Sequence, residues 1–120
     1  MYITEHDKAI IRQLVEKQLQ AFQQNDGETA FALTSPTVQS KFEQTEDFIM
    51  MLKDKYHCIF SSRSIMFRGF TLISNYPALV SVVMDQGGNL AQGVFILQHQ
   101  PDYSWRIHGY ELLSIDEKII

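Results

Sequence analysis

Four histidines, one cysteine and a few polar side chains in apolar stretches are the groups of this sequence that could do chemistry. His99 and His108 fall on neighbouring predicted strands. A two-residue loop at 102–103 would set His99 opposite Arg106, with His108 two residues further along the same face, whereas a three-residue loop would turn His99 to the other face. Because Arg106 would repel a metal ion and no third ligand is obvious, we expect no metal site and a surface or structural role for both histidines.

The adjacent residues His57 and Cys58 have the types needed for a thiolate–imidazole dyad. Neighbouring side chains of an extended segment point to opposite sides, so this pair predicts no dyad. A lone cysteine is more often a small buried hydrophobic residue. With no partner for an internal disulfide, Cys58 also agrees with a reducing compartment.

Gln18 lies in the middle of an apolar stripe, between Leu14 and Phe22. Burying its amide without hydrogen bonds would cost roughly 1–3 kcal/mol, so the sheet, a water molecule or a ligand must satisfy it. A structural hydrogen bond is the favoured interpretation, and a place in a pocket is the alternative.

Other polar residues extend the set of pocket candidates. Arg63 and Arg68 could bind an anionic ligand, or pair with acids such as Asp54 and Asp85 at the surface. Tyr110 and Glu111 alternate along a strand, so only one of them can face a pocket. The sequence contains no phosphate-binding glycine loop, nucleophile elbow or zinc spacing, and we expect no cofactor. The pocket candidates are Gln18, Phe22, Tyr56, His57, Arg63, His99, His108 and Tyr110.

The first half of the chain has the 3.6-residue period of helices. Thr4 and Asp7 form a capping-box pattern that starts the first helix. Asn25-Asp26-Gly27 ends it, with Gly27 tolerating the left-handed cap conformation, and the last helix ends near Tyr56. The N-caps predicted for the later helical segments are Asp26, Ser35 (before Pro36) and Thr45.

After Arg63 the period changes to two, which predicts strands at 64–74, 78–86, 90–100 and 104–113. Turn signals at Asn75-Tyr76-Pro77, Gly87-Gly88-Asn89 and Pro101-Asp102 separate them. Helices followed by a meander predict an α+β fold, in which the N-terminal helices pack in the concave face of a curved antiparallel four-stranded sheet. Trp105 should be largely buried and anchor the last strand.

The predicted strands are apolar on both faces, and the helices can cover only one of them. A second face left open would exceed the apolar patch that soluble monomers usually expose. We therefore expect a homodimer formed through the outer face of the sheet. In a monomer, the tail around Ile115, Ile119 and Ile120 would fold back over the strands instead. The contacts of the dimer are expected to come from Phe70, Leu72, Val82, Phe95 and Leu97.

Composition narrows the class of protein. The 120 residues, 45% hydrophobic and with a net charge of −4, predict one globular domain over 1–120 with a tail at 114–120. No basic stripe exists that could neutralise a run of phosphates, so no nucleic-acid partner is expected. Residues 1–7 hold no apolar stretch, and the apolar run near 80–84 is too short to span a bilayer. We expect a cytoplasmic protein without a membrane partner.

Several short motifs share the pattern of one family: Gln18-Leu19-x-Ala21-Phe22 with Asp26, Ala30-Phe31-Ala32-Leu33-x-Ser35-Pro36, Phe48-x-x-Met51, Arg63-Ser64-Ile65 and Trp105-Arg106-Ile107-x-Gly109. Over residues 4–112 or so, the chain resembles an uncharacterised bacterial family of the nuclear transport factor 2-like superfamily. The resemblance implies a cone-shaped fold, in which a bent sheet wraps around N-terminal helices and leaves a pocket, and it implies frequent dimerisation through the sheet. Members of the superfamily include ketosteroid isomerases, dehydratases and polyketide cyclases as well as ligand-binding and association domains, so the resemblance implies no particular reaction.

Two functions follow from these observations. The first is a non-catalytic domain that binds a small, mostly apolar ligand or a protein partner in or around the cone, since helix faces and aromatic residues predict a lined cavity. The alternative is an enzyme of the isomerase or dehydratase type. Its general base would lie within about 3.2 Å of a second polar group inside the cavity. The candidates for that base are His57, His99, His108 and Asp85.

Overall fold

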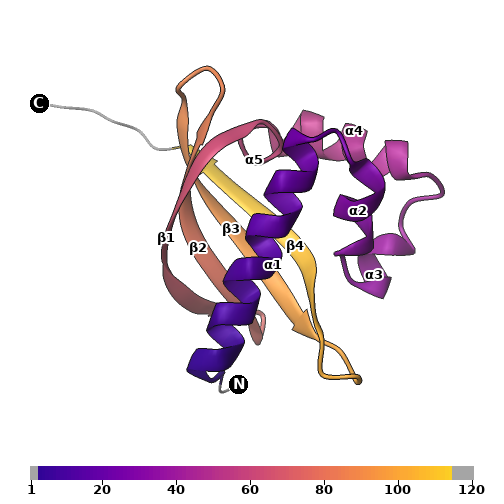
Figure 1. The fold of residues 1–120 in the computed structure, drawn as a ribbon, viewed down its shortest axis with the longest axis vertical. Coiled ribbons are helices and arrows are strands. Elements are labelled where there is room, and N and C mark those ends of the chain that lie inside the picture. Colours follow the sequence, from indigo (N-terminus) through magenta and orange to yellow (C-terminus); the bar gives the residue numbers. More distant parts are fainter. Residues whose placement is uncertain (1–2, 115–120) are drawn as a thin grey trace, which may run out of the picture.

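The computed structural model describes residues 3–114, which form helices followed by a single antiparallel sheet (Figure 1). The helices are α1 (Glu5–Gln23), α2 (Gly27–Ala32), α3 (Pro36–Gln39), α4 (Thr45–Lys55) and α5 (His57–Phe60). The strands β1 (Ser62–Ile73), β2 (Tyr76–Asp85), β3 (Leu90–His99) and β4 (Trp105–Ser114) pair in the order β1-β2-β3-β4. The predicted α+β fold is confirmed. Apart from Ser114, which ends β4, the predicted tail lies outside the described residues.

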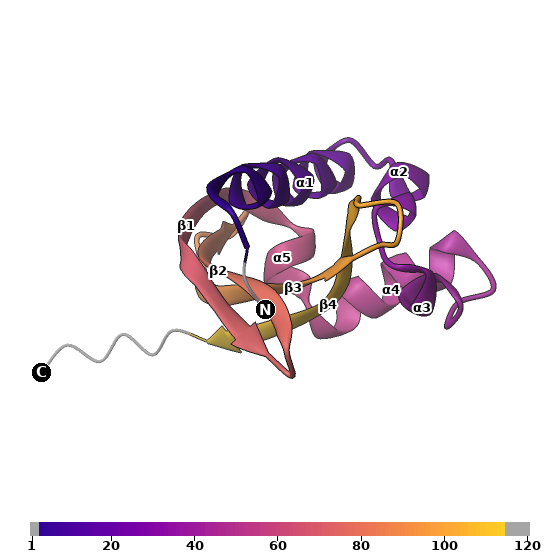
Figure 2. The same cartoon turned by 90° about the horizontal axis from the view of Figure 1, so that it is seen from below.

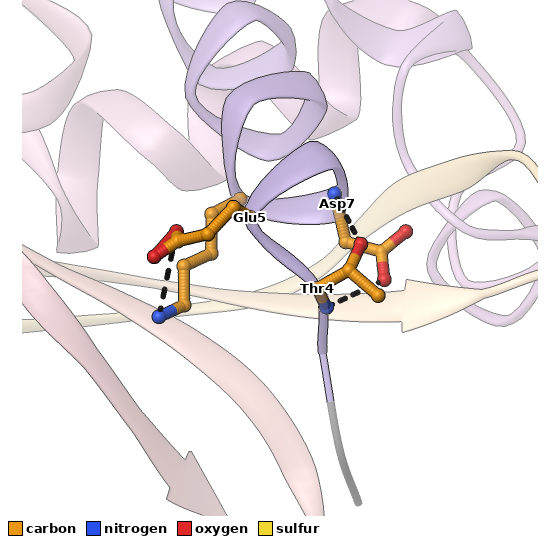
Figure 3. A network of polar contacts seen from close by, with 4 residues as sticks. Thr4, Glu5 and Asp7 are labelled. Atoms are coloured by element: carbon orange, nitrogen blue, oxygen red, sulfur yellow. Dashed lines mark hydrogen bonds and ion pairs between the residues drawn. The ribbon is translucent and has the colours of Figure 1, made fainter.

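The predicted capping box starts α1 (Figure 3). The Thr4 hydroxyl accepts a hydrogen bond from the amide of Asp7 at 3.0 Å, and the Asp7 carboxylate accepts one from the amide of Thr4 at 2.9 Å. An exposed ion pair joins Lys8 and Glu5 beside it at 3.8 Å. The box satisfies two amides that the first helical turn leaves without partners.

Several predicted helix ends need correction. Asn25, with φ of 56°, takes the left-handed conformation after α1, and Gly27 instead begins α2 behind its N-cap Asp26. Asparagine adopts that conformation more readily than most residues other than glycine. Ser35 caps α3 as predicted, whereas Thr45 is the first residue of α4 and Gln44 occupies the N-cap position.

The three hairpins are tight, but two differ in position from their sequence signals. The β1–β2 turn is Ser74-Asn75, both with positive φ, and Tyr76 already belongs to β2. That pattern is typical of a two-residue primed turn. The β3–β4 connection is a three-residue loop, 101–103, in which Tyr103 is left-handed (φ of 69°) and Gln100 pairs with Ser104. His99 therefore lies opposite Trp105 and not opposite Arg106, so the three-residue alternative is correct.

The sheet is bent by extra residues in its edge strands. In β1, Arg63 and Arg68 have no Cα partner in β2 where the register shifts, and in β4 His108 is the extra residue between the pairs Ile96–Gly109 and Leu97–Ile107. Such bulges bend a strand and raise its local twist. Beyond β4, residues 33–35 run alongside the strand, with backbone hydrogen bonds between Ser35 and Ile107 and between Ile107 and Leu33.

The face of the sheet that packs against α1 and α5 is called the inner face here (Figures 1 and 2). Trp105, 5% exposed as predicted, joins β4 to the start of α1: its indole N–H donates to Asp7 at 3.4 Å, and its ring stacks on His99 at 4.4 Å. Within the described residues, no helix is both long and apolar enough to cross a membrane. The fully buried side chains shared by helices and sheet are Ile11, Val15, Ile59, Leu79, Val83, Phe95, Leu97 and Ile107.

The outer face of the sheet carries a second apolar surface. Val80, Val82 and Met84 alternate with the buried inner residues of β2 and are only half-buried. Met66 of β1 and Leu113 of β4 are 57% and 56% exposed. Ala78 and Val94 are buried but lie outside the core cluster, as expected of residues on the opposite face. We call the following residues the outer-face patch: Met66, Val80, Val82, Met84, Leu90, Ile96 and Leu113.

This placement corrects the predicted dimer contacts. Phe95 and Leu97 are fully buried in the core, and Phe70 packs against it. Leu72 is half-exposed but faces the inner side of the sheet. It alternates with Thr71, which faces outwards and pairs with Ala78. Only Val82 of the predicted contacts lies on the outer face. The extra residue Arg68 turns Phe70 and Leu72 inwards, and the β2–β3 register, which pairs Val82 with Gln92, leaves Phe95 and Leu97 on the inner face.

Candidate functional site

Gln18 is fully buried where α1, α2 and β4 meet. Its side-chain amide donates to the carbonyl of Ala30 at 3.0 Å, and its oxygen accepts the Tyr110 hydroxyl at 2.9 Å. Burial raises the pKa of Tyr110, so this phenol stays protonated and donates. The ring of Tyr56 packs on Tyr110 at 5.5 Å. These three pocket candidates therefore contact one another: Gln18 and Tyr110 through a hydrogen bond, and Tyr110 and Tyr56 through their rings.

His108 lies beside the hydroxyl of Ser35, as a catalytic base lies beside a nucleophilic serine. Its Nδ1 lies 2.8 Å from the Ser35 hydroxyl, and its ring packs on Tyr76 at 4.7 Å. Burial, helped by the charge of Lys41, lowers the pKa of His108 and favours the neutral ring. Ser35, however, has no exposed surface and accepts the amide of Val38 at 3.2 Å as the cap of α3. The contact fastens the 33–35 segment to the β4 bulge, where no substrate reaches the hydroxyl.

His57 and Cys58 lie in a short helix, α5, and not in the extended segment that the sequence suggested. His57 is exposed and lies 3.3 Å from the hydroxyl of Ser61. Cys58 is 8% exposed, with its sulfur 3.8 Å from the carbonyl of Val83. Burial, and secondarily the charge of Asp85, raises the pKa of the Cys58 thiol. Cys58 is a buried thiol whose raised pKa favours the protonated form, and the helical backbone removes the extended-segment reason for expecting no dyad.

Asp85 organises the β2–β3 turn. One carboxylate oxygen accepts the amides of Gly87 and Asn89 at 3.0 and 2.8 Å, and the other accepts the Asn89 side chain at 3.2 Å. The hydrogen bond from the amide of Asn89 is the main reason why the pKa of Asp85 is lowered. A carboxylate held in its ionised form by turn amides is a weak base.

The remaining sequence candidates lie far from one another in the fold. Arg63 is exposed at a bulge of β1, and His99 is exposed at the end of β3, with its Nε2 3.1 Å from the carbonyl of Tyr103. Within residues 3–114, no three His, Cys, Asp or Glu side chains gather in a way that could hold a metal ion.

A cleft of about 450 Å³ opens between the end of α1, the start of α2 and one face of α4. Phe22, Ile49 and Phe60 are apolar lining residues that are buried or half-buried, and the rings of Phe22 and Phe60 lie 5.4 Å apart. Met50, 61% exposed, forms part of its edge. Of the sequence-predicted pocket residues, only Phe22 lines this cleft.

Charged side chains surround the cleft. Asp26, Glu28 and Glu46 line it with exposed carboxylates. The hydrogen bond from the Thr29 side chain is the main cause that lowers the pKa of Asp26, which keeps this carboxylate ionised. The ammonium group of Lys53 lies 5.4 Å from the ring of Phe60. From the sequence, Asp26 was predicted only as a helix cap, and the cleft was not predicted.

One signal in the sequence could have indicated this cleft. Glu46, Ile49, Met50 and Lys53 have the spacing i, i+3, i+4 and i+7, which places them on one face of α4. The other face of α4 holds Phe48 and Leu52, which are fully buried in the core.

Comparison with known proteins places the chain in a family. No match was found among the curated proteins, and none among the solved structures. The superfamily that the sequence resembles stays a prediction. A family model with the description "Domain of unknown function (DUF4864)" matches residues 4–120, nearly the whole chain. The chain therefore belongs to the DUF4864 family.

Proposed function

We propose that this domain is a non-catalytic association module, which pairs with a second copy of itself through the outer face of its sheet. The observation that carries the proposal is the outer-face patch, whose residues lie outside the core cluster. Paired positions align its residues across the sheet: Met66 lies beside Val82, and Val82 continues through Gln92 to Leu113. The surface is largely apolar, with Gln92 as a polar residue within it, and a large exposed apolar surface marks an interaction site in soluble proteins.

A second copy is the occupant that fits this surface best. The outer face is mostly apolar along β2 and at Leu90, Val94 and Ile96 of β3, and two such faces can pack at about 10 Å with their side chains interdigitated. Two-fold pairing uses the same patch on both partners and needs no other complementary surface. The polar groups inside the cone support an association role over ligand binding there, because Gln18 and Tyr110 are already hydrogen-bonded to each other.

The isomerase or dehydratase alternative finds less support. Asp85 is bound by its own turn, and the hydroxyl beside His108 is fully buried. A general base needs access to the proton that it removes.

Light scattering at tens of micromolar protein tests the proposal. We expect a mass twice the 13.9 kDa of the chain. Met66→Lys and Leu72→Lys form a matched pair on β1, since these residues are 57% and 50% exposed but lie on opposite faces of the strand. Met66→Lys together with Val82→Lys should give a monomer, and Leu72→Lys should remain a dimer. A wild-type mass of 13.9 kDa, or equal dissociation by both sets of changes, would refute the proposal.

A further inference from the structure

The cleft between α1, α2 and α4 does not involve the outer-face patch and offers a different chemistry. Its volume of about 450 Å³ lies within the range of roughly 300–1,000 Å³ that is usual for small-molecule sites. The two helices that form its sides approach closely, since a Cβ added at Gly27 would lie 3.2 Å from the side chain of Ile49. The rings of Phe31 and Phe48, 5.0 Å apart, hold α2 and α4 together behind it. The cleft is thus formed by packed helices and not by a loose loop.

The lining residues of α4 divide the cleft into zones. Glu46 and Lys53 lie seven residues apart, which along a helix is a distance of about 10 Å. Ile49 and Met50 lie between them and, with Phe22 and Phe60, provide an apolar centre. A partly exposed methionine beside aromatic rings suits a site that adapts to the shape of an apolar group.

The charge at the acidic end is the feature that selects the ligand. Asp26, Glu28 and Glu46 contribute three formal negative charges to the lining, against one positive charge from Lys53. The N-termini of α2 and α4 add a partial positive charge of at most about one half each. The carboxylates therefore outweigh the positive charges, and the Lys53 ammonium is also already placed near the ring of Phe60.

We propose that this cleft binds a small amphipathic cation, an amine on an apolar body, with the body between Phe22, Ile49 and Met50 and the ammonium group at Glu46 and its neighbouring acids. Asp26 already accepts hydrogen bonds from the amide and hydroxyl of Thr29, and an apolar body alone would bring no positive charge to Glu28 and Glu46. A carboxylate-bearing ligand would meet like charges at the acidic end. The amine matches both the centre and the acidic end of the cleft.

A matched set of probes tests this inference: phenethylamine, phenethyl alcohol and phenylacetate, which share a phenyl body and differ in charge. Backbone amide NMR of the full chain reports both the affinity and the site. We expect phenethylamine to bind at least about fivefold more tightly than phenylacetate, since two exposed ion pairs of about 0.5 kcal/mol each supply that factor. The resonances that move should be those of Gly27, Ile49, Met50 and Phe60.

Variants on one turn of α4 separate specific binding from general attraction to an acidic protein. Glu46→Gln should weaken phenethylamine binding about two- to fivefold, in line with the loss of one exposed ion pair. Asp47→Asn removes the same charge one residue later, outside the cleft, and should leave the affinity unchanged. At an ionic strength of about 1 M, where the Debye length is about 3 Å, the preference for the amine should largely disappear.

Three results would overturn the inference: equal or tighter binding of phenylacetate, equal effects of Glu46→Gln and Asp47→Asn, and shifts confined to the outer-face patch. None of them bears on the mass measured by light scattering, so failure of this inference and failure of the proposed dimer are distinguishable.

Discussion

Removing either partner of the Gln18–Tyr110 hydrogen bond should destabilise the domain, because the remaining partner is left buried without its hydrogen bond. Tyr110→Phe leaves the aromatic ring in its contacts with Tyr56 and Phe95, at 5.5 and 6.0 Å, but takes away the hydroxyl. The oxygen of Gln18, fully buried, then has lost its donor. An unsatisfied buried acceptor costs about 1–3 kcal/mol, which is the expected loss in the free energy of unfolding.

Gln18→Met is the complementary change, because methionine has a similar length and no hydrogen-bonding amide. It leaves the Tyr110 hydroxyl without its acceptor, at a similar cost of about 1–3 kcal/mol. The carbonyl of Ala30 loses the amide of Gln18 but keeps the amide of Leu33 at 3.3 Å. In the double variant neither member of the pair remains, so its loss of stability should fall short of the sum of the single losses by about 1 kcal/mol or more.

Urea unfolding followed by circular dichroism measures the free energy of unfolding of all four proteins in this double-mutant cycle: the wild type, the two single variants and the double variant. Tyr103→Phe is the control, since Tyr103 is 82% exposed and its change should cost less than about 0.5 kcal/mol. If Tyr110→Phe is equally harmless, or if the single effects add to within about 0.5 kcal/mol, then the pair is not a structural hydrogen bond. That result would return Gln18 to the pocket candidates.

Two further expectations concern β4. Trp105→Ala should lower the free energy of unfolding by about 3–5 kcal/mol, because it removes a large side chain, only 5% exposed, from between α1 and His99. A loss below about 1 kcal/mol would mean that the ring is not packed as described. His108 should make stability pH-dependent: because burial lowers its pKa from the ordinary 6.5, the unfolded chain binds more protons than the folded one just below that pH. The associated stability is present above pH 6.5 and is lost as the pH falls below it, and His108→Gln should flatten the slope of unfolding free energy against pH in that range. An unchanged slope would contradict this assignment.

Interactions between residues close in the sequence were predicted well. The capping box of Thr4 and Asp7 and the cap at Ser35 depend on a side chain and a backbone amide three residues away, so the sequence contains all that is needed. The turn at Gly87-Gly88-Asn89 was predicted for the same reason, although the role of Asp85 in holding it was not. Where two neighbouring residues could both take the left-handed conformation, as at Asn25 and Gly27, local chemistry did not distinguish them.

The candidate site was predicted poorly, because it depends on contacts between distant segments. Gln18 was correctly identified as a buried amide in need of partners, but those partners, Ala30 and Tyr110, come from other elements. The cleft joins the α1–α2 turn, α4 and Phe60 of α5, and of the predicted pocket residues it contains only Phe22.

The sequence by itself determined that helices precede strands, the N-caps of α1, α2 and α3, and the presence of two apolar sheet faces, because periodicity and capping are properties of short segments. The tertiary structure decided which residues occupy each face. The left-handed Tyr103 and the extra residue His108 set the β3–β4 register, and a shift of one residue exchanges inner and outer side chains. Phe95 and Leu97 were predicted from the sequence as dimer contacts, but they belong to the core because the β2–β3 register pairs Leu79 with Phe95 and Val82 with Gln92.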